Sequence, residues 1–276
     1  MTDFSNRYAA KQNVITRDTL LSDEFFKQAS AAMGEKGWSA AELDASLAAA
    51  LAARPKTPAA AEDVWLFGYG SLIWNPAFHF ADRRIARLHG WHRRFCLWTE
   101  MGRGSPGAPG LVLGLKSGGS CIGMAFRIPA AEAETELALV WRREMLHGSY
   151  LPRWVTIDCT DLGSVPALTF VVNTKHPRHA GRLDIETVTR TLARASGHFG
   201  RCADYFFSTI HALEELGIHD AQLFQLYDRV IRLCAEQTQA ERAEVERLGA
   251  ERATAAHEEA PCPCTDAAAE LAEKPL

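Results

Sequence analysis

The sequence lacks several features that would each define a class of protein. It contains no apolar run near the roughly 20 residues that a membrane-spanning helix needs, so no membrane span is expected. Its formal net charge is −4 at pH 7, which argues against general affinity for nucleic acid or anionic membranes. Its first residues show no basic-then-apolar signal pattern. These absences predict a cytoplasmic chain without nucleic-acid or membrane partners.

The histidines and cysteines form no recognisable metal-binding pattern. None of the 10 His residues has the spacing His-x-x-x-His or HExxH. The 7 Cys residues, an odd number scattered along the chain, fit reduced thiols better than a disulfide framework. The close pair Cys262 and Cys264 offers two ligands only and lies in an Ala-, Glu- and Pro-rich tail. We therefore predict neither a metal ion nor a cofactor.

The segment 64–74, with the sequence VWLFGYGSLIW, is the central feature of the chain. Its first four residues are bulky and apolar, which is typical of a buried strand. The two glycines that follow permit a tight turn and allow a ligand to approach backbone amides, and a Ser hydroxyl stands beside them. The third glycine of a dinucleotide fingerprint and the Lys of a phosphate loop are missing. The alternative interpretation is a strand that ends in an ordinary turn.

The rest of the chain predicts a mixed α/β domain with helical additions. Residues 1–61 are interpreted as an accessory helical arm and linker, 62–236 as the main domain, and 237–276 as a helical extension with a disordered tail. In the arm, Ser39 and Glu42 have the spacing of a capping box. One apolar stripe is predicted there, made of Leu20, Leu21, Phe25, Phe26 and Met33. Short strands are predicted at 83–89, 93–99, 111–115, 121–128, 153–159 and 167–173, and helices at 129–146, 184–195, 203–216 and from 220 onward.

Two segments in the β-rich part leave alternatives open. The loop 102–110 is rich in Gly and Pro and carries one Arg, which suits either the rim of a site or a long hairpin loop. The segment 91–95 mixes basic and aromatic residues, as proteins that bind single-stranded nucleic acid do. Its alternation and the acidic pI favour a strand with one solvated face.

Glu144 departs from the apolar pattern of the helix predicted at 129–146. It follows Ala133, Leu137, Val140 and Trp141 on one face of that helix. A buried carboxyl group is usually paired or functional, and burial raises its pKa towards the range useful for proton transfer. Arg142 and Arg143 are neighbouring candidates for its partner. The alternative is a frayed helix end that leaves Glu144 in solvent.

Several of these segments together resemble the ChaC-type γ-glutamylcyclotransferases, and most of all their bacterial, glutathione-specific branch. The resemblance spans about 64–233 and excludes the arm and the tail. The motifs that carry it are FGYGSLIWNP (67–76), LHGWHRRFC (88–96), RGSP (103–106), PGL (109–111), WRREM (141–145), GSY (148–150), FVVN (170–173), HP (176–177), ASG (195–197) and LGIHD (216–220).

The resemblance implies a small, curved and partly closed β-sheet with helices outside, and a reaction. The α-amino group of a γ-glutamyl group attacks its own γ-carbonyl and releases 5-oxoproline and an amine, which for glutathione is cysteinylglycine. Glu144 is implied as the general acid and base. The implied substrate-binding residues are Leu66, Phe67, Gly68, Tyr69, Gly70, Ser71, Leu72, Arg103, Tyr150 and Tyr205. Such a reaction needs no metal, because the nucleophile is part of the substrate.

Two departures from the family pattern bear on the substrate. Residues 105–108 lack the family's usual Thr and Glu, and residues 197–202 replace a more polar connection. Glutathione is the predicted substrate, and γ-glutamyl amino acids or γ-glutamylamines are the enzymatic alternative. A non-catalytic γ-glutamyl-binding regulator is a second alternative, disfavoured by the buried acid. The arm as a partner-binding helix is a third. The oligomeric state stays open.

Overall fold

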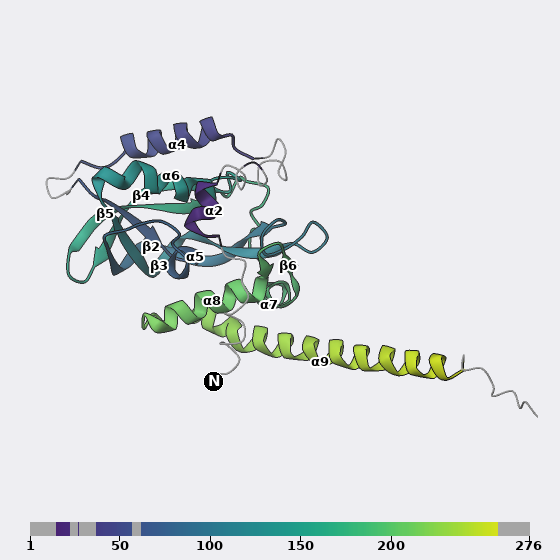
Figure 1. Cartoon of the computed structure of the whole chain (residues 1–276). Helices are drawn as coiled ribbons and strands as arrows, with labels where there is room; N and C mark the ends of the chain where they lie inside the picture. The colour runs from purple at the N-terminus through teal and green to yellow at the C-terminus, as the bar shows by residue number, and fades with distance from the viewer. Residues whose placement is uncertain (1–14, 23–26, 28–36, 57–61, 259–276) are drawn as a thin grey trace, which may run out of the picture. The chain divides into compact units, whose positions relative to one another are not determined.

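The computed structural model describes residues 15–22, 27, 37–56 and 62–258 and shows a barrel with helices on both sides (Figure 1). The described elements are α2 (Arg17–Leu21), α4 (Ala40–Ala52), β1 (Val64–Gly68), α5 (Ser71–Trp74), β2 (Asp82–Thr99), β3 (Gly110–Ile128), η2 (Ala130–Glu132), α6 (Ala133–Glu144), β4 (Tyr150–Cys159), β5 (Gly163–Val172), α7 (Ile185–Arg194), β6 (Ser196–Gly197), β7 (Gly200–Arg201), α8 (Cys202–Glu215) and α9 (Ala221–Glu258).

Five strands close into a barrel in the order β1-β3-β2-β4-β5. Most neighbours are antiparallel, but β1 pairs with β5 in parallel, through Trp65 with Ala167 and Leu66 with Leu168, and this pairing closes the barrel. The sheet is thus fully closed, whereas a partly closed one was expected. Closure removes exposed strand edges and encloses the apolar side chains of β1.

Strands β2 and β3 form one long hairpin where the sequence predicted four short strands. The expected break near Gly90 is a register shift between His89 and Trp91, and Gly90 has a φ of 78°. A second shift lies between Phe95 and Leu97. Such bulges bend a strand without ending it, so the hairpin can curve around the barrel. The predicted strand with one solvated face at 91–95 is part of β2.

Helices cover the barrel on two sides. Figure 1 shows α4 and α6 stacked on one side, and α7 and α8 on the other. Helix α8 ends before Gly217, whose φ is 67°, and Ile218 N–H donates to the Leu213 carbonyl at 2.8 Å. This left-handed C-terminal cap is the reason the predicted helix stops there.

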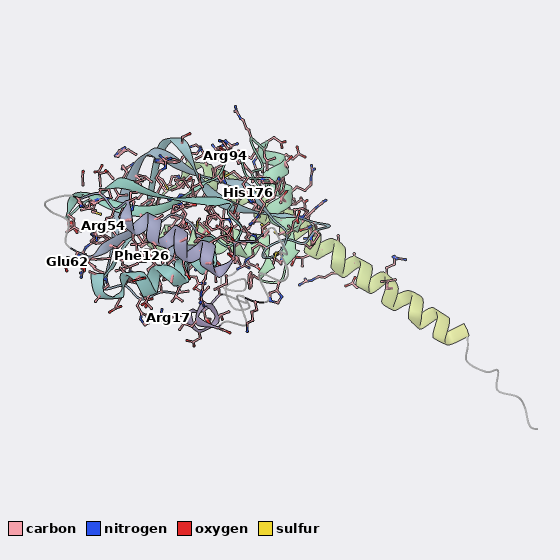
Figure 2. All side chains as sticks on the ribbon, turned by 90° about the horizontal axis from the view of Figure 1, so that it is seen from above. Arg17, Arg54, Glu62, Arg94, Phe126 and His176 are labelled. Carbon is pink, nitrogen blue, oxygen red and sulfur yellow. The ribbon has the colours of Figure 1, made fainter. Side chains whose placement is uncertain are left out.

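The described part of the arm is attached to the main domain. The Ser39 capping box is present at the start of α4, and Trp141 Nε1 donates to Ser46 Oγ at 3.2 Å. Arg54, just after α4, donates to the carbonyls of Glu62 and Asp63, just before β1, at 2.6 Å each. Figure 2 labels Arg54 and Glu62. Arg54 thereby joins the end of α4 to the residues just before β1.

The predicted apolar stripe of the arm is only partly described. Leu20 is buried and Leu21 is 50% exposed, so the two do not share a buried face. A five-residue helix can bury only one side, and Leu21 points to the other. Phe25, Phe26 and Met33 lie outside the described residues.

The chain separates into two compact units, Met1–Leu233 and Cys234–Leu276, and α9 runs through the boundary between them. The predicted limits 1–61, 62–236 and 237–276 stay predictions. Cys262, Cys264 and the predicted disordered tail lie outside the described residues. No described helix combines the length and apolar character that crossing a bilayer requires.

Candidate active site

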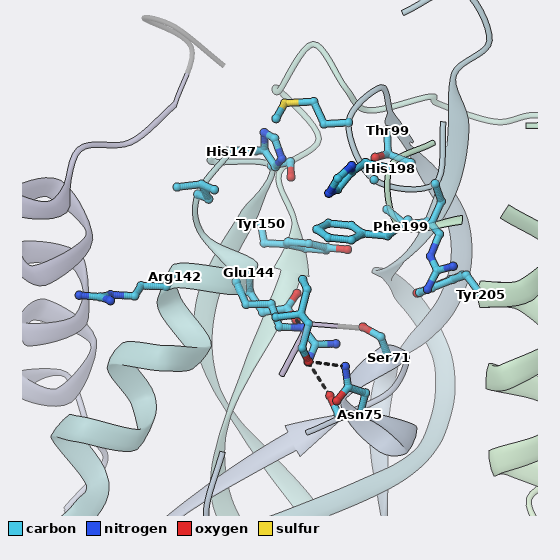
Figure 3. Close-up of a pocket in the computed structure, with 18 of the residues that line it drawn as sticks. Ser71, Asn75, Thr99, Arg142, Glu144, His147, Tyr150, His198, Phe199 and Tyr205 are labelled. Atoms are coloured by element: carbon cyan, nitrogen blue, oxygen red, sulfur yellow. Dashed lines mark hydrogen bonds and ion pairs between the residues drawn. The ribbon is translucent and has the colours of Figure 1, made fainter. Parts of the chain in front are cut away.

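One cavity of about 740 Å³ brings together several residues singled out in the sequence. Its lining includes Glu144, Ser71, Arg103, Tyr150 and Tyr205, which come from five separate parts of the chain. Figure 3 shows Glu144 beside Tyr150, with Ser71 and Tyr205 across the cavity. A volume of this size is typical of sites for small molecules.

Glu144 is the last residue of α6 and faces the cavity with 14% of its side chain exposed. Its Oε1 lies 3.1 Å from Arg143 Nε. Arg143 also donates to the carbonyls of Asn75 and Pro76, which fixes its guanidinium beside the carboxylate. The helix therefore ends without releasing Glu144 into solvent.

Burial raises the pKa of Glu144 above its usual value, and the nearby Arg143 charge opposes part of that rise. Desolvation disfavours the ionised carboxylate, whereas a neighbouring cation favours it. The net effect moves the carboxyl towards a pKa at which it can both accept and deliver a proton. Of the two arginines considered as partners of Glu144, Arg143 forms the ion pair. Arg142 points away from Glu144 in Figure 3.

Two tyrosines of the cavity are held by the backbone of the same residue on β3. Tyr150 Oη donates to the Leu113 carbonyl at 2.6 Å, and Leu113 N–H donates to Tyr205 Oη at 3.4 Å. Burial is the main cause that raises the pKa of both hydroxyls, and the nearby Glu144 charge adds to it. Both tyrosines are therefore neutral at physiological pH and can act as hydrogen-bonding groups of fixed position.

The loop after β1 contributes Ser71 to the cavity. Ser71 opens α5, where Ile73 N–H donates to the Gly70 carbonyl at 2.9 Å and the N–H groups of Ser71 and Leu72 have no acceptor within the helix. A Cβ atom on Gly70 would lie 3.2 Å from Tyr205 Oη, so a glycine lets the loop approach that tyrosine. The carboxylate or the developing oxyanion of a substrate could accept from these amides.

The other predicted residues of this loop do not line the cavity. Leu66, Phe67 and Leu72 are buried, and Gly68 packs against Leu72 and Phe126. Tyr69 Oη donates to the Phe170 carbonyl at 2.9 Å. These residues fix the position of the loop, and their contact with substrate stays a prediction.

The rim of the cavity joins the two segments that depart from the family pattern. Phe199 N–H donates to the Gly102 carbonyl at 2.9 Å, and a Cβ atom on Gly197 would lie 2.2 Å from the Gly104 carbonyl oxygen. Arg103 and Phe199 line the cavity from this rim. The loop 102–110 joins the paired ends of β2 and β3, so it is the long hairpin loop of one interpretation, and through Gly102 and Arg103 it is also the rim of the cavity.

Residues that the sequence did not single out also line the cavity. His147 is one, and burial lowers its pKa to about 3, helped by the charges of Arg178 and His176. Ile15, Thr19 and Ser22 of the arm line it as well. No local pattern could have placed the arm there, because its contacts join residues far apart in the sequence.

A separate carboxylate of α6, Glu136, is more completely buried than Glu144. Within the described residues, ligand atoms of His79, Glu132 and Glu136 lie within 4.8 Å of one another. Both oxygens of Glu136 accept from Arg17, at 2.6 and 2.8 Å, and Oε2 also accepts from the His79 N–H at 2.8 Å. This arrangement is that of a buried ion pair, which uses the lone pairs a metal ion would need.

A desolvated carboxyl group in a small-molecule cavity is an arrangement that acid–base enzymes use. The ChaC-like protein family model matches residues 64–233. The chain is 42% identical over 224 residues to the glutathione-specific γ-glutamylcyclotransferase of Escherichia coli (strain K12), covering 81% of this chain and 95% of that protein. The chain belongs to the ChaC-like family.

Other relatives agree with this assignment. The chain is 28% identical over 182 residues to glutathione-specific γ-glutamylcyclotransferase 1 of Homo sapiens, covering 64% of this chain and 82% of that protein. A crystal structure of the glutathione-specific enzyme from yeast superimposes with a TM-score of 0.57 at 20% identity, over 62% of this chain and 99% of that one. Its likeness confirms the predicted γ-glutamylcyclotransferase fold.

The match to the E. coli relative reaches further along the chain than expected. It covers 224 residues, which exceeds the 170 of 64–233 by more than the 43 residues that follow 233, so it includes part of the arm. The resemblance read from the motifs stopped at the limits of the main domain.

Proposed function

We propose that this protein is a glutathione-specific γ-glutamylcyclotransferase with Glu144 as its general acid and base. The observation that carries the proposal is the position of Glu144 in the cavity, where burial raises its pKa and Arg143 holds its carboxylate. The 42% identity to the E. coli enzyme supports glutathione as the substrate. Reduced cysteines such as the buried Cys96 and Cys202 support a cytoplasmic location.

The proposed reaction is an intramolecular aminolysis. Glu144, as the carboxylate, accepts a proton from the α-ammonium group of the γ-glutamyl moiety. The freed amine attacks the γ-carbonyl carbon, forms the new C–N bond of 5-oxoproline and places negative charge on the carbonyl oxygen. As the tetrahedral intermediate collapses, the old amide C–N bond breaks and Glu144 delivers its proton to the departing nitrogen. The attacking nitrogen gives up its second proton, again through the Glu144 carboxylate, to the departing amine, which leaves as an ammonium group. The products are 5-oxoproline and cysteinylglycine, and Glu144 ends as the carboxylate.

Apart from proton transfer, the site has to hold the substrate in a conformation that can react. The glutamyl chain must fold so that its amine lies within attack distance of its own γ-carbonyl, a restriction that can contribute several kcal/mol, about 7 or more in well-oriented intramolecular reactions. We assign the binding of the reacting end to Ser71 and the first amides of α5. Tyr150 and Tyr205, fixed on Leu113, also line the cavity and restrict how the substrate can lie in it.

The experiment is to measure release of 5-oxoproline and cysteinylglycine from glutathione by the wild type and by Glu144→Gln. Glutamine keeps the shape of the side chain and cannot exchange the proton. We expect product from the wild type and a loss of about 10²–10⁴-fold in kcat for the variant. Equal rates in the two proteins would exclude Glu144 as the catalyst.

The control for folding is the melting temperature of the variant. Because the folded-state pKa of Glu144 lies above its unfolded value, the folded protein binds more protons between the two pKa values, and stability falls as pH rises through that interval. Glu144→Gln removes this cost at neutral pH, so we expect it to melt no lower than the wild type. No product from glutathione with either protein, but product from γ-glutamyl amino acids, would reassign the substrate.

A further inference from the structure

The arm is fixed to the main domain by a buried ion pair next to the cavity. Arg17 Nη1 donates to Glu136 Oε2 at 2.6 Å and Arg17 Nη2 to Glu136 Oε1 at 2.8 Å, a two-point contact. Only 3% of the Glu136 side chain is exposed. Two parallel bonds between a guanidinium and a carboxylate set orientation as well as distance. Helix α2 therefore has a defined position against α6, and Figure 2 labels Arg17 at that place.

Two residues of the cavity itself hold the backbone of the arm. Asn75 Nδ2 donates to the Ile15 carbonyl at 2.8 Å, and Arg142 Nη1 donates to the Leu20 carbonyl at 3.0 Å. Asn75 and Arg142 both line the cavity. The arm is thus bonded at both ends of α2 to neighbours of Glu144: Arg142 lies two positions before it in the chain, and the Asn75 carbonyl accepts from Arg143, the partner of Glu144.

Between these attachments the arm presents side chains to the cavity. Ile15, Thr19 and Ser22 line it, whereas Leu21 on the same short helix is 50% exposed. We propose that the segment 15–22 is a wall of the substrate site and contacts the part of the substrate beyond the reacting γ-glutamyl group. The proposal rests on the proposed function, and it makes Thr19 a specificity-determining residue.

The size and chemistry of the cavity indicate which part of the substrate the arm contacts. The reacting amine and carbonyl must lie within hydrogen-bond reach of Glu144, and we place the glutamyl end at Ser71. A cavity of about 740 Å³ has room for a whole tripeptide, so its more distant walls face the leaving peptide. The described residues of the arm that line the cavity offer it two hydroxyls and one apolar side chain, and none of these side chains is charged; the Thr19 hydroxyl also bonds Thr16 Oγ1 at 2.7 Å. These groups suit the amide groups and short side chains of a dipeptide.

The test uses the full chain and three variants. Thr19→Phe fills the proposed wall and keeps the backbone N–H that donates to Thr16 Oγ1 at 3.1 Å. Leu21→Phe adds the same side chain to the solvent side of α2 and is the matched control. Arg17→Met cuts the ion pair and adds no atom to the cavity. For each, kcat and KM for glutathione are measured, and glutathione binding is measured by calorimetry in the Glu144→Gln background.

We expect Thr19→Phe to raise KM and the calorimetric Kd about tenfold, in the range by which a misfitting pocket discriminates, with kcat within about twofold. Arg17→Met is also expected to raise KM and Kd, whereas Leu21→Phe is expected to leave KM and Kd unchanged. Unchanged KM and Kd in Thr19→Phe, or equal changes in Thr19→Phe and Leu21→Phe, would overturn the proposal.

Failure of the proposed function gives a different result. If the wild type releases no product from glutathione while the arm variants still weaken its binding, the reaction is wrong and the wall is right. If Glu144→Gln with an unaltered arm binds no glutathione and the wild type releases no product from it, the proposed reaction and the proposed wall are both wrong. Normal wild-type turnover with arm variants that bind and react like wild type refutes the wall alone.

Discussion

Glu136 and Glu144 are both buried carboxylates of α6, but they have different hydrogen-bond and ion-pair partners. Glu136 accepts two bonds from Arg17 and one from a backbone N–H, so its charge is matched on every side. Glu144 has Arg143 at 3.1 Å and otherwise loses solvation, which raises its pKa. The first arrangement suits a structural ion pair, and the second leaves a carboxyl free to exchange a proton. Burial alone does not separate the two roles.

The pH dependence of the rate should report on Glu144. The carboxylate form must accept the proton, so kcat/KM for glutathione is expected to fall about tenfold per pH unit below the pKa of Glu144. Because that pKa is raised above the usual value of 4.5, the acidic limb should lie nearer neutrality than for an exposed Glu. The Arg143 charge opposes the rise, so Arg143→Met should move the limb to higher pH. The measurement is kcat/KM against pH for both proteins.

His147 is the control for that profile. Its pKa of about 3 leaves it neutral over the whole assay range, so His147→Gln should keep the acidic limb at the same pH whatever it does to the rate. A limb that disappears in His147→Gln, or one that stays in place in Arg143→Met, would contradict the assignment to Glu144.

At the scale of helices and strands, the sequence predicted those helix ends that depend on residues close together in the chain. The capping box at Ser39 and the stop at Gly217 were visible because each depends on residues a few positions apart. The hairpin of β2 and β3 was divided wrongly, since a bulge and a break look alike in sequence: both place a Gly between apolar runs. Closure of the barrel depends on pairing between β1 and β5, which are about a hundred residues apart.

The rim of the cavity depends on close approach of backbones. A Cβ atom on Gly104 would lie 2.0 Å from the Gly110 nitrogen and 2.3 Å from the Thr99 carbonyl oxygen. Gly104→Ala must therefore displace backbone, at a cost of about 2–3 kcal/mol. We expect a melting temperature lower by about 5–10 °C, from thermal unfolding followed by circular dichroism.

Gly107→Ala is the matched control in the same loop, because no atom lies within 4 Å of its added Cβ. We expect it to melt within about 1–2 °C of the wild type, as surface substitutions usually do. Similar melting of the two variants would show that the rim tolerates separation of these backbones. A selective rise in KM for Gly104→Ala would further show that the rim contacts substrate, since Arg103 lies next to it.

For the whole molecule, the sequence predicted the family and the fold better than the extent of the cavity. Glu144 and the loop at 68–71 stand out because one breaks an apolar stripe and the other combines glycines with a Ser. The structure brings Ser71 and Glu144 into one cavity, together with the predicted Arg103, Tyr150 and Tyr205. The arm was separated from the site on composition. Its partner Glu136 is 119 residues from Arg17, and such a pairing leaves no local pattern.

Two truncations test whether the N-terminal segment contributes to the site while the C-terminal segment does not. Removal of residues 1–22 takes away the proposed wall and leaves the Glu136 carboxylate without Arg17, so KM should rise about tenfold or more and the melting temperature should fall. Removal of residues 241–276 takes away none of the described residues that line the cavity, and kcat/KM should stay within about twofold. Steady-state kinetics and thermal melts of both proteins give the comparison. Equal kcat/KM in the two truncated proteins would instead favour the alternative in which the arm serves a binding partner.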